Sequence, residues 1–259
     1  MRTLRTMNSK LQLSLLLLGF ALAAAGSASA QDDFETQREA AVLAAVDRVA
    51  PAVVRIETFG GLEKVGRLLI GEGPTTGLVV SSDGYVLSSA FNFVNQPNSI
   101  LVSFADGKRL AARVVARDQS RMLVLLKVDV EGEIPVPPAV PRSEMAVGQT
   151  AIALGRVYEL EEPNLSEGII SAKSRVWGKA IQTDAKISPS NYGGPLIDLE
   201  GRVLGILVPL SPQGQEAVAG AEWYDSGIGF AIPLDDVNRH LDRMNAGQDL
   251  QPGILGVSL

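Results

Sequence analysis

A succession of short runs rich in Val, Ile and Leu, each four to six residues long, constrains the fold of this chain most strongly. Runs of this length and composition, bounded by polar and Gly-containing segments, are typical of β-strands. The expected strands are Ala52–Glu57, Thr76–Ser81, Tyr85–Ser88, Ile100–Phe104, Ala111–Ala116, Leu123–Val128, Thr150–Leu154, Gly168–Ala172, Ala180–Thr183, Val203–Val208 and Ile228–Ala231.

The segments between these runs favour an antiparallel arrangement. Asp83-Gly84, Asp106-Gly107 and Glu200-Gly201 are turn pairs in which Gly supplies a positive φ. Many short strands joined in this way form a sandwich or a barrel. The Pro-rich stretch Ile134–Pro141 divides the runs into two groups. We therefore expect an all-β protein with two antiparallel barrels, at about residues 51–130 and 142–232.

Two segments have helical spacing instead. Apolar residues recur at intervals of three and four from Phe34 to Val49, where Pro51 ends the pattern. The same intervals occur between Leu234 and Met244. The chain is thus expected to carry a short N-terminal helix and a C-terminal helix.

The first 30 residues have the features of a secretory signal peptide. Arg2, Arg5 and Lys10 precede the apolar run Leu11–Ala25, and the small residues Ala28–Ala30 precede a polar segment. A membrane anchor needs about 20 apolar residues, and this run is shorter. We expect cleavage after residue 30, an exported protein in the periplasm or outside the cell, and no stable membrane insertion after cleavage.

Composition excludes several classes of function. The 259 residues carry a net charge of −6; loss of the signal peptide reduces the 23 basic residues by three, to 20 against 29 acidic ones, so the charge falls to −9. A surface that binds phosphates needs the opposite sign, so no nucleic-acid partner is expected. The chain has no Cys and a single His, His240, which rules out disulfides, thiolate chemistry and metal sites with several His ligands. No metal or cofactor is expected.

The segment Ile181–Leu196 (IQTDAKISPSNYGGPL) resembles the active-site segment of the HtrA (Deg) family of exported serine proteases, which have a trypsin-like fold. Further segments resemble the family in the same order: Pro51–Val54, Asp83–Leu87, Ala105–Gly107, Leu125–Lys127, Gly168–Ala172 and Gly227–Pro233. The resemblance implies an N-terminal segment over residues 31–50, a protease-homology domain over 51–246, and a linker with the first strand of a PDZ domain over 247–259. It also implies a homotrimer formed through the start of the domain, near Phe34.

The residues at the three catalytic positions differ from those of the family. Where the family has its Ser nucleophile, inside Gly-Asn-Ser-Gly-Gly, this chain has Tyr192. Counting from Leu87 places Phe91 at the His position, with Asn92 as the alternative because the segment has one extra residue. Alignment on Leu125–Lys127 places Met122 at the Asp position.

Such a triad cannot transfer a proton from a nucleophile, because it has no base. His240 lies on the expected C-terminal helix, where a solvated side chain is the simpler interpretation. A buried Asp without its imidazole partner would be an uncompensated charge, so replacement of all three residues is physically consistent. We expect Phe91, Met122 and Tyr192 to pack together as an apolar plug.

Three other parts of the expected site are the oxyanion loop, a possible Ser–Lys pair and residues near the substrate pocket. The loop of Ser190, Asn191, Tyr192, Gly193 and Gly194 is the remnant of an oxyanion loop, and Ser190 replaces a Gly whose backbone shape a side chain could disturb. Lys186 with Ser188 or Ser190 would be a Ser–Lys pair, although no motif supports it. Trp223, Tyr224 and Gly227 border the region of the substrate pocket and are candidates for peptide binding.

The sequence thus predicts a catalytically inactive protease homologue that binds unfolded peptides or protein partners. The alternative is a serine endopeptidase that uses non-standard residues. A third interpretation, a fold whose function has lapsed, is disfavoured by the intact residues on both sides of Tyr192.

Overall fold

A computed structural model describes residues 33–61, 64–65, 68–69, 73–210 and 227–251. The chain divides into two units, Met1–Leu43 and Ala44–Leu259. In the first unit, the described residues 33–43 are helical, and Arg38 pairs with Glu35 across one helical turn at 3.6 Å. The helix continues to residue 49 and is followed by the 3-10 helix η1 (Ala50–Ala52).

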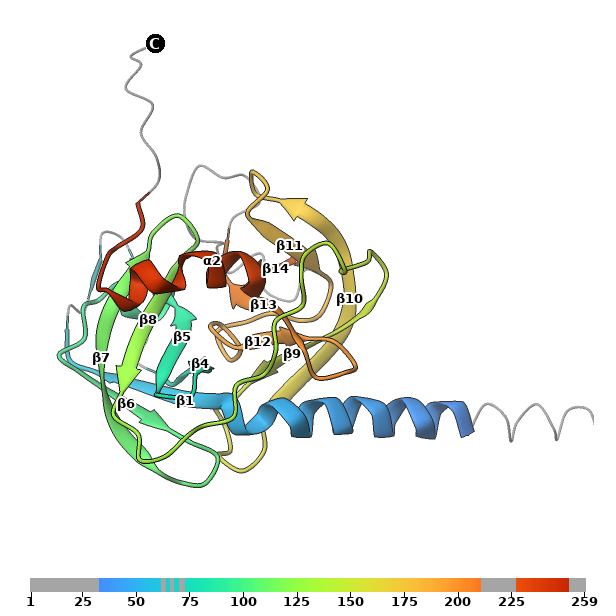
Figure 1. Cartoon of the computed structure of the whole chain (residues 1–259), viewed down its shortest axis with the longest axis horizontal. Coiled ribbons are helices and arrows are strands. Elements are labelled where there is room, and N and C mark those ends of the chain that lie inside the picture. The colour runs from blue at the N-terminus through green and yellow to red at the C-terminus, as the bar shows by residue number, and fades with distance from the viewer. Residues whose placement is uncertain (1–32, 62–63, 66–67, 70–72, 211–226, 252–259) are drawn as a thin grey trace, which may run out of the picture. The chain divides into compact units, whose positions relative to one another are not determined.

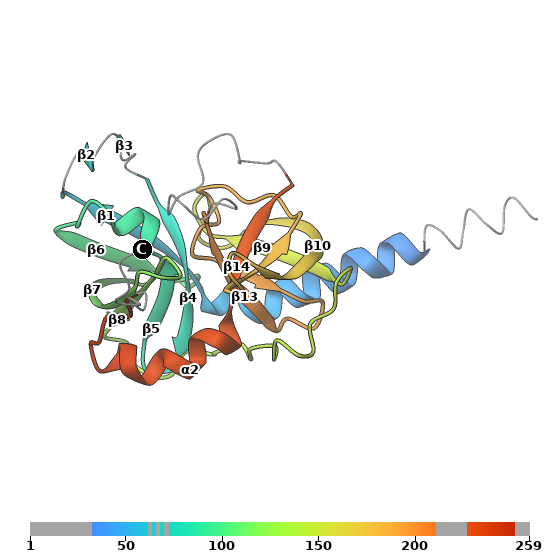
Figure 2. The same ribbon diagram turned by 90° about the horizontal axis from the view of Figure 1, so that it is seen from above.

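Most of the second unit consists of two closed antiparallel barrels, which lie side by side in Figures 1 and 2. The N-terminal barrel has the strand order β1-β4-β5-β8-β7-β6. Its strands are β1 (Val53–Phe59), β4 (Thr75–Ser81), β5 (Tyr85–Ser89), β6 (Ser99–Ser103), β7 (Arg109–Asp118) and β8 (Leu123–Val128). The short pair β2 (Lys64–Val65) and β3 (Leu68–Leu69) lies between β1 and β4 in sequence, and η2 (Ala90–Phe93) follows β5.

The C-terminal barrel has the strand order β10-β11-β14-β13-β12-β9. Its strands are β9 (Thr150–Gly155), β10 (Asn164–Arg175), β11 (Ala180–Thr183), β12 (Pro195–Ile197), β13 (Val203–Val208) and β14 (Gly229–Pro233). All six residues of β13 are buried, which explains why this strand has a continuous apolar sequence. The prediction of two antiparallel barrels is confirmed.

Helix α2 (Leu234–Asn245) follows β14 directly and packs against β13 and β7, one strand from each barrel. Leu234, Val237 and Met244 are buried, as the spacing predicted. Figure 1 shows α2 passing over both barrels. Beyond it, Leu250 exchanges backbone hydrogen bonds with Arg117 and Gln119 at the end of β7. The helix and this short parallel bridge thus join the two barrels.

Several strands differ from the sequence expectation. β2 and β3 were not expected, and β7 is ten residues long instead of the six from Ala111 to Ala116. β10 is twelve residues long instead of the five from Gly168 to Ala172, because its flanking residues alternate between exposed and partly buried and so do not form an apolar run. β12 was not expected, since it has only three residues and begins at Pro195. Among the described residues, no helix is long and apolar enough to cross a membrane.

Candidate functional site

The loop between β11 and β12 carries Tyr192 and is held in shape by its own side chains. The Asn191 side chain is buried; its Oδ1 accepts the Ser188 N–H at 3.0 Å and its Nδ2 donates to the Lys186 carbonyl at 3.0 Å. The Asn191 N–H also donates to the Ser188 carbonyl at 3.0 Å. The side-chain amide of Asn191 thus bonds to the backbone at both Lys186 and Ser188, so the path of the loop depends on Asn191.

The same loop docks against β4 of the N-terminal barrel. The Tyr192 carbonyl accepts from Thr75 Oγ1 at 3.0 Å and from the Thr76 N–H at 3.3 Å. Thr76 Oγ1 donates to the Ser190 carbonyl at 3.2 Å. Both Thr side chains are buried, so these bonds are shielded from water and fix the loop at the junction of the barrels. Nothing in the local sequence of Thr75 and Thr76 marked them for this role.

Two glycines allow this close approach. Gly193 has φ +82°, and a Cβ there would lie 2.3 Å from both Ser88 Oγ and the Thr76 carbonyl oxygen. A Cβ on Gly194 would lie 2.0 Å from the Leu154 carbonyl oxygen. A side chain at position 193 would therefore move the loop away from β4 and β5, and one at position 194 would move it away from β9.

The aromatic ring of Tyr192 belongs to the core of the C-terminal barrel. The residue is only 2% exposed and lies in one cluster with Ile187, Leu196 and Leu207. Phe91, from η2 of the other barrel, packs against this cluster. The two rings meet edge to face, with centroids 5.7 Å apart and an interplanar angle of 82°. The structure thus brings together Phe91 and Tyr192, as the sequence analysis expected.

Met122 approaches the same place through its backbone. It is 7% exposed, and its carbonyl accepts the N–H of Ala90, the neighbour of Phe91, at 2.7 Å. Its φ of +56° is unusual for a residue with a side chain. Asn92, the alternative to Phe91, is partly exposed in η2.

The backbone at Ser190 is not in the left-handed region. Ser190 is not among the described residues other than Gly that have a positive φ, which are Gln96, Met122, Val176 and Trp177. A side chain at position 190 therefore fits without the strain that the replacement of Gly suggested.

The residues of a Ser–Lys pair are not arranged for catalysis. Ser188 Oγ and Ser190 Oγ lie 2.8 Å apart and share a hydrogen bond. Lys186 is exposed, whereas a lysine that acts as a base must be desolvated beside the hydroxyl.

Arg156, which sequence reasoning missed, is the largest of the fully buried side chains. Its guanidinium donates to the carbonyls of Ala50, at 2.9 Å, and Leu160, and its backbone N–H donates to Thr76 Oγ1 at 2.8 Å. Burial lowers the pKa of Arg156, while the charge of Glu161 opposes that shift. Arg156 therefore connects the start of the N-terminal barrel, the acidic β9–β10 loop and β4.

The remaining candidate site residues are His240, Gly227, Trp223 and Tyr224. His240 is partly exposed on α2, an element that contributes neither Phe91, Met122 nor Tyr192. Gly227 is exposed with φ +75°. Trp223 and Tyr224 lie outside the described residues.

Comparison with known proteins agrees with the two-barrel architecture. The family of the trypsin-like peptidase domain matches residues 75–206, which contain Phe91, Met122 and Tyr192. The chain belongs to the HtrA family of trypsin-like serine proteases.

Three HtrA relatives show the range of similarity. A probable periplasmic serine endoprotease DegP-like of Chlamydia trachomatis is 34% identical over 71% of this chain and 36% of its own length. A putative serine protease HhoA of Synechocystis is 30% identical over 89% of this chain and 63% of its own. A DegP-like protein of Halomonas elongata is 30% identical over 94% of this chain and 56% of its own.

The chain thus spans between about one third and two thirds of the length of these HtrA relatives. Two of the three are named periplasmic, in agreement with the export that the first residues predict.

Proposed function

We propose that this HtrA family member is a catalytically inactive homologue that acts outside the cytoplasm by binding unfolded peptides or protein partners. The observation that carries the proposal is the contact between Phe91 and Tyr192, at the positions that alignment gives to the base and the nucleophile. Phe91 has no atom that accepts a proton, and Tyr192 is buried. Acyl transfer needs both groups at the surface of a cleft.

The replacements are also consistent with stable packing. Met122 and Tyr192 are buried and Phe91 is partly buried. In place of polar triad atoms, each of which would need a partner, these side chains supply mostly apolar surface. The loop that carries Tyr192 still has its anchors on Thr75, Thr76 and Asn191. Selection for binding would preserve this loop without a nucleophile.

A surface for peptides lies beside this loop on β10. Leu165 and Ile169 are exposed by 43% and 39%. Two hydrogen bonds join this part of β10 to the loop. Ser166 Oγ donates to the Lys186 carbonyl at 2.8 Å, and the Ile169 N–H donates to Asp184 Oδ1 at 2.6 Å. Exposed apolar side chains held next to a rigid loop can bind apolar side chains of an unfolded chain.

The test uses fluorescein-labelled, unfolded casein, with binding followed by fluorescence anisotropy and cleavage by gel electrophoresis. We expect binding without cleavage. Leu165→Ser with Ile169→Ser should weaken binding by about tenfold, because two exposed apolar contacts are lost. Val136→Ser, an exposed apolar residue of the crossover between the barrels, is the matched control and should bind as the unmodified protein does.

The alternative function is that of a serine endopeptidase with non-standard residues, and the names of the relatives favour it. Cleavage of casein that Ser188→Ala or Ser190→Ala abolishes would establish it. Absence of both binding and cleavage would refute binding of unfolded chains as the function.

The homotrimer, and the linker with the first strand of a PDZ domain at residues 247–259, remain part of the proposal. Analytical ultracentrifugation tests the first, with three times the chain mass expected. Residues 252–259 lie outside the described residues.

A further inference from the structure

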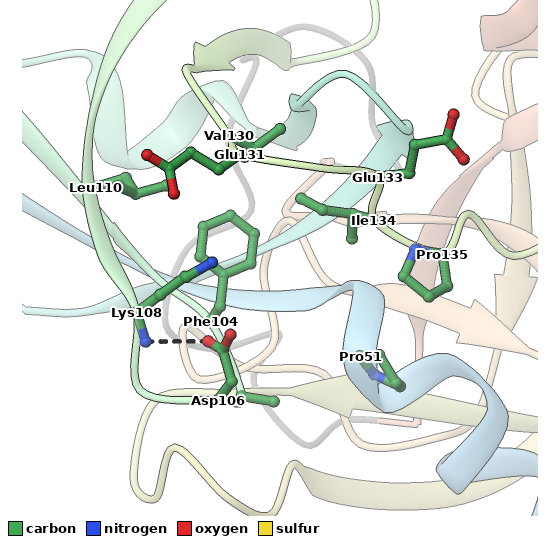
Figure 3. A pocket seen from close by; sticks show the side chains of 11 residues that line it. Pro51, Phe104, Asp106, Lys108, Leu110, Val130, Glu131, Glu133, Ile134 and Pro135 are labelled. Atoms are coloured by element: carbon green, nitrogen blue, oxygen red, sulfur yellow. Dashed lines mark hydrogen bonds between the residues drawn. The ribbon is translucent and has the colours of Figure 1, made fainter.

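A cavity of about 440 Å³ opens at one end of the N-terminal barrel (Figure 3). It lies between the β6–β7 turn, η1 and the segment that leaves β8. None of its lining residues belongs to β5, η2 or the loop that carries Tyr192. Its volume is within the range of about 300–1,000 Å³ that is typical of ligand sites.

The interior of the cavity is apolar. Phe104 and Leu110 come from the β6–β7 hairpin, Pro51 from η1, and Ile134 and Pro135 from the crossover segment. Figure 3 shows the Phe104 ring between the two sides of the cavity. Such a surface suits a large apolar side chain.

The rim is acidic. It has the carboxylates of Asp106, Glu131 and Glu133 against the single ammonium group of Lys108. Among the described residues, none of the three carboxylates forms an ion pair within 4.0 Å. Asp106 Oδ1 accepts a hydrogen bond from the backbone N–H of Lys108 at 3.0 Å. Glu131 and Glu133 are exposed on one side of the cavity, and Asp106 lies on the other (Figure 3). A ligand with positive charge next to its apolar group would therefore complement both parts of the site.

Backbone groups along the rim favour a peptide over a compact molecule. Residues 129–133 lie outside every strand of the described chain, and their N–H groups donate to no other described backbone group. The first such bond after β8 is from Ile134 to the Ser82 carbonyl, at 3.3 Å. The main-chain carbonyls of a bound peptide could therefore accept hydrogen bonds from this rim while a side chain enters the cavity.

We propose that this cavity, lined by Phe104, Leu110 and Ile134 and rimmed by Asp106, Glu131 and Glu133, binds basic peptide segments that carry a large apolar side chain. The site is distinct from the Phe91–Tyr192 contact. Its occupancy does not depend on whether the protein is a protease.

The test measures binding of the fluorescein-labelled peptide Gly-Arg-Phe-Lys-Gly to the exported, purified protein by fluorescence anisotropy. We expect one peptide per chain, and weaker binding when NaCl rises from 50 to 500 mM, because salt screens exposed charges. Glu131→Gln with Glu133→Gln keeps the shape of the rim and should weaken binding by about fivefold. The control pair Glu161→Gln with Glu162→Gln, two exposed carboxylates of the β9–β10 loop, should leave binding unchanged.

Two further measurements complete the test. The peptide Gly-Glu-Phe-Glu-Gly should not bind, whereas equal binding would show that the acidic rim has no role. Leu110→Glu should abolish binding of the basic peptide while the circular dichroism spectrum stays unchanged. If the Glu131/Glu133 variant binds as well as the unmodified protein, or if the chain self-associates through this surface and excludes the peptide, the proposal is wrong.

Discussion

The rings of Phe91 and Tyr192, one from each barrel, meet edge to face with their centroids 5.7 Å apart. Tyr192 is simultaneously part of the C-terminal core and joined to β4 through its carbonyl. The contact therefore joins the two barrels, with its Tyr192 ring buried in the C-terminal core.

The energy of this contact can be measured with a double-mutant cycle. Phe91→Ala and Tyr192→Ala should each destabilise the protein, the second by about 3–5 kcal/mol because Tyr192 is buried. The coupling between them should be about 0.5–1.5 kcal/mol, as for other aromatic pairs. Urea unfolding of the four proteins measures these values, and a coupling indistinguishable from zero would mean that the rings do not interact.

A comparison of substitutions at Gly193 and Gly107 separates the cost of backbone strain from the cost of steric clashes. Both residues have φ +82°, but only Gly193 has close neighbours. Gly107→Ala meets nothing within 4 Å and should cost about 1 kcal/mol of stability. Gly193→Ala places a Cβ against Ser88 and Thr76 and should cost about 3 kcal/mol or more. Thermal unfolding compares the two variants; equal shifts in Tm would show that the loop does not press against β4 and β5.

Arg156 should stabilise the protein although it is a buried cation. Arg156→Ala leaves the carbonyls of Ala50 and Leu160 without this donor and creates a cavity, so we expect a loss of about 3–4 kcal/mol. Arg156→Met fills most of the volume and should recover about half of that loss. A change below about 1 kcal/mol for the Ala variant would exclude this anchoring role.

Asp83 should stabilise the fold fully only at pH values above its ordinary pKa of 3.8. The hydrogen bond from Ser81 and the nearby Lys127 hold the pKa of Asp83 below its ordinary value of 3.8. A carboxylate with a lowered pKa in the folded state stabilises that state above its unfolded pKa, and the effect is lost as the pH falls through the folded pKa.

Asp83→Asn, which keeps the turn chemistry, should therefore lower the free energy of unfolding at pH 7, by less than about 1 kcal/mol because the group is exposed. The difference between the two proteins should become smaller as the pH falls below 3.8. Urea unfolding at pH 7 and at pH 2 measures it, and a difference as large at pH 2 as at pH 7 would assign the effect to something other than the charge.

The sequence predicted the parts of the structure that depend on local patterns. Apolar runs and Gly turns located most strands of both barrels, and the three- and four-residue spacing located α2. The sequence predicted a β10 shorter than the observed strand, because the residues near its ends are only partly buried. A pattern of apolar residues indicates which residues are buried, but it does not indicate which residues form backbone hydrogen bonds.

The site was predictable only where a family motif marks it. The segment around Tyr192 identified the loop, but Arg156 and Thr76 act through residues distant in sequence, and no local pattern reports such contacts. The left-handed backbone of Met122 likewise depends on the tertiary structure, since Met has no intrinsic preference for positive φ.

Labelling with a fluorophosphonate, which reacts only with an activated Ser, tests the central claim most directly. The purified protein is treated beside its Tyr192→Ser variant, with trypsin as the positive control. We predict no labelling of either form, because restoring the Ser provides no base to activate it. Labelling of the unmodified protein would contradict the claim that this HtrA homologue has no catalytic serine.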